Sequence, residues 1–313
     1  MKIRILGSAA GGGFPQWNCN ARLSHAVRAG RAGFLPRTQS SIAVSADGKD
    51  WAVFNASPDL KQQIEAAPAL QPRSNGPSRN SPIEAVVLTN ADVDHIAGLV
   101  NLREREPFTL YATDRVLGTL RANSIFNVLD PQLVPRRPLP SYQPIALHGP
   151  QGPLGLTVEA FPVPGKIALF LEDAAKTEEN FGTAEGDTIG VRITASSGEQ
   201  GSACLYIPGC ARIDGALLDR VNGAGCLMFD GTVFTDTEMQ EAGVGTKTGA
   251  RMGHLAISGP GGSLETFRDV HIKRKIYVHI NNTNPILEPG SEAEHQVMAA
   301  GWDVAFDGME IEL

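Results

Sequence analysis

The sequence has no run of 18 apolar residues, and it contains only four cysteines among 313 residues. The first absence excludes a membrane-spanning helix, and residues 1–6 lack the apolar core of a secretory signal peptide. The four cysteines form no CxxC pair, which is typical of a protein in a reducing compartment. We therefore expect a cytoplasmic protein without membrane insertion and without a structural disulfide.

Positive charge is also scarce, with 27 Lys and Arg against 34 Asp and Glu and a net charge of −7. Because a nucleic-acid phosphate backbone requires clustered basic residues, we expect no nucleic-acid partner. No linker-like stretch divides the chain, so we expect residues 1–313 to form a single domain. The sequence leaves the oligomeric state open, with a homodimer among the alternatives.

Segments rich in β-branched residues alternate with a few short helical patterns. Strands are expected at residues 2–6, 41–45, 51–55, 83–88, 154–161, 190–194, 203–207, 225–229 and 275–280. Helices are expected at residues 58–66, 264–270 and 292–300, capped by Ser57, Ser263 and Ser291 respectively. Strands in runs with helices between them predict an α/β protein with mixed sheets in layers. The long segment 165–187 is expected to be an exposed loop that acts as a functional lid, with disorder as the alternative.

The densest group of chemically active side chains follows the predicted strand at 83–88. Asp92, Asp94 and His95 lie within four positions there, and His279 follows another predicted strand. Because α/β sheets place their sites at the carboxyl ends of strands, we expect these groups to meet. Two histidines and one carboxylate form a facial triad that suits non-haem Fe(II). Asp92 would be an extra ligand or a carboxylate beside the ligands.

Each of these residues also has a structural interpretation. Asp94 could cap a helix that begins near His95, and His279 could be a hydrogen-bonded residue at a strand end. We expect His254 to act as a proton donor or to orient a ligand, with an exposed loop histidine as the alternative. Asp230 and Cys210 follow further predicted strands and are candidates for the rim of the same pocket. For Cys210 a buried thiol is the alternative.

The segment from Asn90 to Leu99 resembles the His-x-His-x-Asp-His-x-x-Gly-Leu signature of the metallo-β-lactamase superfamily. Asp94, His95 and His279 match its second metal position. Asn90 and Asp92 stand where hydrolytic members have two histidines for the first zinc. The resemblance implies an αββα sandwich of two mixed sheets flanked by helices. The two replacements argue against a two-zinc hydrolase.

Five further segments resemble a branch of that superfamily that works in the biosynthesis of pyrroloquinoline quinone (PQQ). They are residues 7–20, 89–95, 206–210, 229–232 and 252–254. The resemblance implies hydroxylation of the tyrosine ring of a small Glu-Tyr-derived precursor, with Fe(II) as cofactor and O2 as co-substrate. Other PQQ-pathway proteins are the implied partners. An alternative description of the branch is a carrier that moves PQQ or its precursor toward the periplasm.

Two features bear on these alternatives. A carrier pocket for the multiply charged PQQ anion would gather cations, for which Lys166, Lys247 and Arg251 are the candidates. Many members of the branch hold a structural zinc with further cysteines in the opening segment, whereas Cys19 stands alone here. Because one cysteine cannot supply the ligands of a closed tetrahedral site, we expect no structural zinc in this segment.

Overall fold

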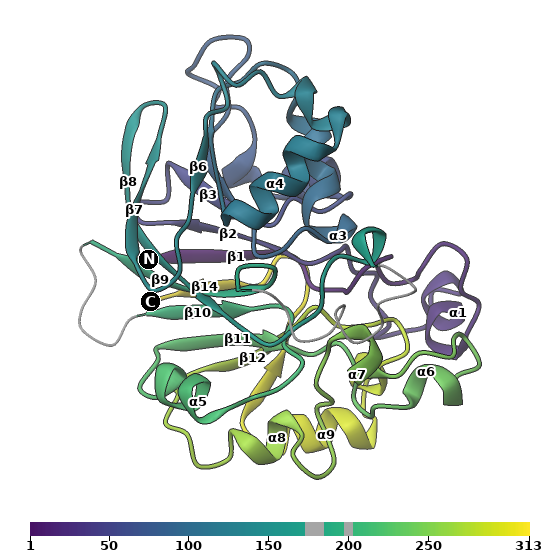
Figure 1. The fold of residues 1–313 in the computed structure, drawn as a ribbon. Helices are drawn as coiled ribbons and strands as arrows, with labels where there is room; N and C mark the ends of the chain where they lie inside the picture. The colour runs from purple at the N-terminus through teal and green to yellow at the C-terminus, as the bar shows by residue number, and fades with distance from the viewer. Residues whose placement is uncertain (173–184, 197–202) are drawn as a thin grey trace.

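The computed structural model describes residues 1–172, 185–196 and 203–313, and two seven-stranded sheets form its centre (Figure 1). The first sheet has the strand order β14 (Glu310–Glu312), β1 (Lys2–Gly7), β2 (Ser41–Ser45), β3 (Trp51–Phe54), β4 (Ile83–Val87), β5 (Thr109–Ala112) and β6 (Arg136–Pro138). The second has the order β13 (Trp302–Val304), β12 (Lys275–Val278), β11 (Cys226–Asp230), β10 (Cys204–Ile207), β9 (Ile189–Ala195), β8 (Gly152–Pro162) and β7 (Pro144–Gly149).

Both sheets are mixed in the same way. In the first, β14, β1, β2 and β3 pair antiparallel and β3 to β6 pair parallel. In the second, β7 to β10 pair antiparallel and β10 to β13 pair parallel. The parallel halves hold β4, β11 and β12, so the carboxyl ends of these strands are free to carry a site.

A core of apolar side chains fills the space between the sheets. Ile3 and Ile5 of the first sheet and Ile276 and Val278 of the second belong to it. Strand β4 is buried over its whole length. Its Ala85 and Val87 belong to this core, and its Ile83 and Val86 belong to the apolar cluster on the helix side. Parallel strands covered on both faces are predominantly apolar, which explains the sequence of β4 apart from Glu84.

Helices cover the outer face of each sheet and give the four layers of the predicted sandwich (Figure 1). Beside the first sheet lie α2 (Leu60–Ala66), α3 (Val93–Ile96) and α4 (Asp114–Ala122); beside the second lie α1 (Arg22–Arg28), α5 (Gly215–Val221), α6 (Glu238–Glu241), α7 (Gly249–Met252), α8 (Ser263–Thr266) and α9 (Glu292–Ala299). Short 3-10 turns are η1 (Pro68–Leu70), η2 (Ala97–Leu102), η3 (Ser124–Val128), η4 (Leu169–Leu171) and η5 (Pro285–Leu287). None of the helices in the described ranges has the length and apolar character needed to cross a bilayer.

All nine predicted strands are present, and Ser291 caps α9 by accepting a hydrogen bond from the Glu294 amide at 3.1 Å. The prediction that Ser263 caps a helix over 264–270 is wrong. Ser263 is the first residue of α8, which ends at Thr266, and its buried hydroxyl pairs with the Tyr277 hydroxyl at 2.8 Å. The prediction that Ser57 caps a helix over 58–66 is wrong at its start, because α2 begins at Leu60 and Asp59 occupies its N-cap position. Of the predicted loop at 165–187, residues 173–184 lie outside the described part.

Candidate metal centre

The turn after β4 brings three polar side chains to the edge of the first sheet. Asn90 and His95 are buried, and Asp94 lies on the short helix α3, which follows β4. The Ala56 amide donates to the His95 carbonyl at 2.7 Å, and the Gly98 amide donates to the Ala56 carbonyl at 2.9 Å. Asp92 occupies the N-cap position of α3, and no side chain caps this helix. The alternative that Asp94 is a helix cap is therefore wrong.

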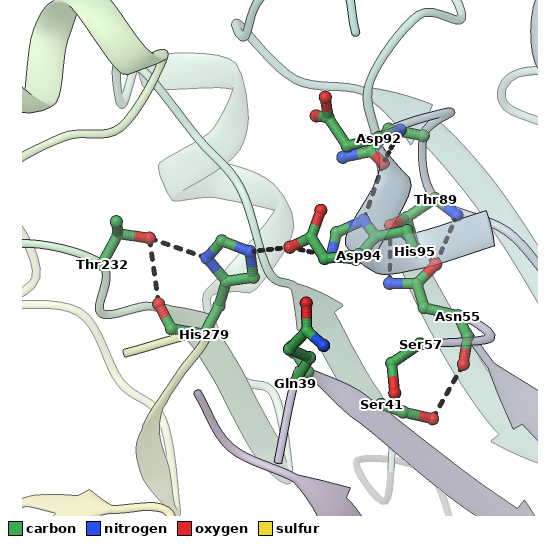
Figure 2. A network of polar contacts seen from close by, with 12 residues as sticks. Gln39, Ser41, Asn55, Ser57, Thr89, Asp92, Asp94, His95, Thr232 and His279 are labelled. Carbon is green, nitrogen blue, oxygen red and sulfur yellow. Dashed lines mark hydrogen bonds and ion pairs between the residues drawn. The ribbon is translucent and has the colours of Figure 1, made fainter. Parts of the chain in front are cut away.

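His279 follows the last residue of β12 and approaches the same point from the second sheet (Figure 2). Its backbone has a φ of 56°, in the left-handed region. A non-glycine residue there costs about 1–2 kcal/mol, and such strain clusters at functional sites. The Thr232 hydroxyl contacts both the Nδ1 and the carbonyl oxygen of His279, at 2.8 and 2.9 Å. The surrounding chain thus holds an unfavourable conformation in place.

Asp94, His95 and His279 converge on one point. The Oδ2 atom of Asp94 lies 3.0 Å from Nε2 of His279 and 3.9 Å from Nε2 of His95. One ligand atom from each residue lies within 4.8 Å of the other two. Figure 2 shows the Asp94 carboxylate between the two imidazoles. The predicted set of two histidines and one carboxylate is therefore assembled in space.

The proton positions on the two rings fit a metal ion. The amide oxygen of Asn90 only accepts hydrogen bonds, and it lies 2.7 Å from Nδ1 of His95, so Nδ1 carries the proton and Nε2 carries a lone pair. That Nε2 atom is buried and has no hydrogen-bond partner. Buried polar atoms are almost always paired, and metal-bound histidines donate their other ring proton in this way. The residues present therefore fit a metal ion at His95 Nε2.

A second cluster of potential ligands, Asp230, His254 and His279, is closed by hydrogen bonds. Asp230 is fully buried, and its Oδ2 accepts from His254 Nδ1 at 2.6 Å and from the Cys210 amide at 2.8 Å. Its Oδ1 accepts from the Thr232 hydroxyl at 2.6 Å and from the Thr232 amide at 3.0 Å. Because these contacts satisfy the carboxylate, hydrogen bonds alone explain the arrangement of this cluster, which supports the first one through His279.

The charges of the first cluster are strongly perturbed. Burial would raise the pKa of the Asp94 carboxyl, but the neighbouring His95 and the hydrogen bond from His279 outweigh it and hold that pKa well below its usual range. Burial lowers the pKa of His95 to about 4. Burial would also lower the pKa of His279, but its hydrogen bond to Asp94 outweighs this and raises it. A cation would thus replace a proton at His279 Nε2.

A pocket of about 260 Å³ opens beside this cluster. Its wall includes the three candidate ligands, residues near the N-terminus and residues of the α6–α7 region. The lining residues include Gly11, Gln16, Asn90, Asp92, Asp94, His95, Lys166, Met239, Lys247, Met252, His254, His279 and Asn281. Asp92 therefore lies in the pocket, outside the closely spaced set of three. His254 also lines it, and Asp230 lies behind His254. Lys166 and Lys247 also line the pocket, as the binding of an anionic ligand would require.

Two other sequence candidates lie elsewhere. Cys210 is fully buried, its thiol contacts the Arg212 carbonyl at 3.1 Å, and it does not line the pocket, so the buried-thiol alternative is the correct one. Arg251 pairs with Glu172 at 3.3 Å. The sequence reasoning missed the hydrogen-bonding roles of Asn90 and Thr232. Their positions directly after β4 and β11 were the available signal.

Comparison with known proteins agrees with this geometry. Residues 50–280 match the beta-lactamase superfamily domain. Coenzyme PQQ synthesis protein B of Methylobacterium nodulans is 49% identical over 316 residues, covering 100% of both chains. The protein of the same name from Gluconacetobacter diazotrophicus is 50% identical over 311 residues, covering 98% of each. The chain belongs to the coenzyme PQQ synthesis protein B family.

Solved structures support both the family and the fold. The crystal structure of Zn²⁺-bound PqqB from Methylobacterium extorquens superposes with a TM-score of 0.93 at 48% identity, covering 100% of both chains. A diphosphatase of the PhnP family has a TM-score of 0.68 at 19% identity, covering 100% of this chain and 97% of that one. The second likeness shows the fold alone. The chain therefore has the metallo-β-lactamase fold and takes part in PQQ biosynthesis.

Proposed function

We propose that this member of the PQQ synthesis protein B family is a mononuclear Fe(II) hydroxylase that uses O2 to oxidise the tyrosine ring of a Glu-Tyr-derived precursor. The observation that carries the proposal is the unpaired, buried Nε2 of His95 facing Asp94 and His279. Two histidines and one carboxylate are the ligand set of non-haem Fe(II) oxygenases, in which the bound iron supplies the activation of O2.

The zinc in the Methylobacterium extorquens relative is compatible with iron in this chain. Imidazole and carboxylate ligands accept both ions, and Zn²⁺ binds a given site more tightly than Fe²⁺ does. Metal availability then decides which ion a purified protein holds. We assign Asp94, His95 and His279 as ligands, and Asp92 as a further ligand or as a carboxylate that contacts a metal-bound group.

We assign the proton chemistry to His254 and Asp230. The buried Asp230 carboxylate accepts the proton on His254 Nδ1 at 2.6 Å, which leaves Nε2 of the pocket-lining imidazole with a lone pair. An imidazole oriented by a buried carboxylate is a general base. His254 would take the proton of the substrate phenol, and Asp230 would position the ring and stabilise its charged form.

The test is an anaerobic titration of metal-stripped protein with Fe(II), followed by measurement of O2 consumption with a tyrosine-containing precursor. We expect one iron per chain, lost in Asp94→Ala and His279→Ala and retained in His271→Ala, whose side chain is exposed. His254→Gln should keep the iron and lose most of the O2 consumption. Full iron binding in Asp94→Ala and His279→Ala would refute the ligand assignment.

The carrier of PQQ or its precursor toward the periplasm is a second candidate. The observation that favours it is the presence of Lys166 and Lys247 in the pocket wall, since PQQ is a multiply charged carboxylate. Tight PQQ binding that survives removal of the metal, together with no O2 consumption, would favour this candidate. For either activity we propose the cytoplasm as the site of action, because all four cysteines are free thiols, and other PQQ-pathway proteins as partners.

A further inference from the structure

The pocket beside the metal centre contains charges of both signs. Asp92 and Asp94 contribute carboxylates, and Lys166 and Lys247 contribute ammonium groups. The carboxylates come from the turn after β4, Lys166 from the segment after β8, and Lys247 from the segment between α6 and α7. A ligand of this pocket therefore meets a metal-binding group and a cationic group on different segments of the wall.

Lys166 is already paired with a carboxylate, that of Glu172, which also contacts Arg251. Its Nζ lies 2.9 Å from Oε1 of Glu172, and both side chains are largely buried, with 13% and 11% of their surface exposed. Burial would raise the pKa of Glu172, but the hydrogen bond from Lys166 outweighs it and lowers that pKa. A buried ion pair of this kind is costly to break. An external anion would therefore have to compete with Glu172 for Lys166.

Lys247 differs from Lys166. It is exposed, it lines the pocket, and it forms no ion pair or hydrogen bond with any residue of the described ranges. The other pocket-lining side chains from the same region are the half-buried Met239 and Met252. Methionine sulfur makes favourable contacts with aromatic rings. An uncompensated ammonium group close to two thioethers suits a molecule that joins an aromatic ring to an anionic group.

We propose that Lys247 binds a carboxylate of the substrate and so selects phenols that carry a free carboxylate near the ring. This inference rests on the proposed function, because it assigns a substrate-binding residue to the same pocket. In metal-free protein a substrate carboxylate cannot bind at the metal-binding side of the pocket, because the carboxylates of Asp92 and Asp94 would repel it. Binding to metal-free protein therefore isolates the contribution of Lys247 from that of the metal.

The experiment compares N-acetyltyrosine with N-acetyltyrosinamide, which differ only in a carboxylate and a neutral amide. Dissociation constants are measured by isothermal titration calorimetry with metal-stripped protein at low ionic strength. We expect wild type to bind the acid about three- to tenfold more tightly than the amide, as for one charge-assisted contact near the surface. The preference should disappear in Lys247→Gln and persist in Lys247→Arg.

The matched control is Lys61→Gln on α2, an exposed lysine away from the pocket, which should leave the preference unchanged. Equal affinities for the two probes in wild type, no binding of either probe, or a preference that persists in Lys247→Gln would each overturn the inference. Because these measurements need neither metal nor turnover, a failure of the iron proposal leaves their outcome intact. Conversely, iron-dependent O2 consumption without an acid preference would refute only the role of Lys247.

Discussion

The side chain of Asn90 accepts a hydrogen bond from Nδ1 of His95 at 2.7 Å, and the opposite nitrogen of that ring is left buried without a partner. The hydrolytic relatives implied by the sequence resemblance have a zinc-binding histidine at the position of Asn90. In this chain the position orients the His95 ring. Asparagine at this position thus lacks the imidazole that would bind the first metal, and it fixes the tautomer of His95, a proposed ligand of the second.

Asn90→Ala should lower metal affinity by about ten- to hundredfold, the usual effect of losing the partner that orients a metal-bound histidine. The His95 ring would lose its fixed tautomer, while its Nε2 atom would still be present. Competition with a chromophoric chelator measures the change. The control is Asn101→Ala in η2, which lies at a different pocket. Equal losses in both variants would contradict the role of Asn90.

Thr232→Val should weaken both metal binding and the fold. Its hydroxyl donates to Asp230 at 2.6 Å and accepts from His279 Nδ1 at 2.8 Å, and valine has the same shape without the hydroxyl. We expect a loss of about 1–3 kcal/mol in the free energy of unfolding, because buried polar groups lose their partner, and about tenfold weaker metal binding. Urea denaturation and metal titration test this, and Thr232→Ser should restore both.

Stability should fall between pH 5 and pH 8 because of Glu238. Burial raises the pKa of this carboxyl from its ordinary value of 4.5 to about 7. Since the folded state binds the proton more tightly than the unfolded state, the stabilisation is fully present below the unfolded pKa and is lost as the pH rises through the folded pKa. The loss should be on the order of 2–3 kcal/mol.

Urea denaturation of metal-free protein at a series of pH values measures this dependence. In Glu238→Gln the fall between pH 5 and pH 8 should be smaller than in wild type by that amount, because glutamine does not titrate. Glu65→Gln, an exposed change on helix α2, should keep the wild-type profile. Parallel profiles for wild type and Glu238→Gln would show that Glu238 does not cause the dependence.

Gly98→Ala should destabilise the segment that carries His95. An added Cβ would lie 1.9 Å from the Ser57 carbonyl oxygen and 2.8 Å from that of Ala56, so the backbone itself would have to move. We expect a loss of about 3 kcal/mol or more in the free energy of unfolding. The matched change Gly118→Ala within α4, where the nearest atom lies 3.8 Å away, should stabilise the protein by about 0.5–1 kcal/mol. Thermal denaturation distinguishes the two.

The sequence predicted the central strands well because burial on one or both faces leaves a strong pattern. Strand β4 is apolar at every position except Glu84, and a composition of this kind is typical of covered parallel strands. Strands β5 and β6 were not predicted: β5 has four residues, and the exposed β6 has the sequence Arg-Arg-Pro. The end strands β13 and β14 have three residues each. Pairing with a neighbouring strand, which is not visible in a short segment, creates these elements.

The grouping of Asp94, His95 and His279, the proposed ligands, was predictable because all three are metal-binding residue types that follow strands. The residues that orient these side chains by hydrogen bonds were not predictable, because their contacts depend on the tertiary fold. Thr232 reaches His279 from 47 positions away, and neither residue type by itself indicates a pair. Similarly, Asn90 was interpreted as a lost ligand, since its hydrogen bond to His95 becomes evident only when the local turn is known.

The contact between Asp94 and His279 joins residues 185 positions apart, the first on α3 beside the first sheet and the second at the end of β12 in the second sheet. An ion held there would clamp the two halves of the sandwich at one edge. A ligand that binds only the folded state adds about 4 kcal/mol at a thousandfold excess over its Kd. Amide hydrogens of β4 and β12 should then exchange more slowly in metal-loaded protein. Metal supply would govern how long the chain stays folded as well as how fast it works.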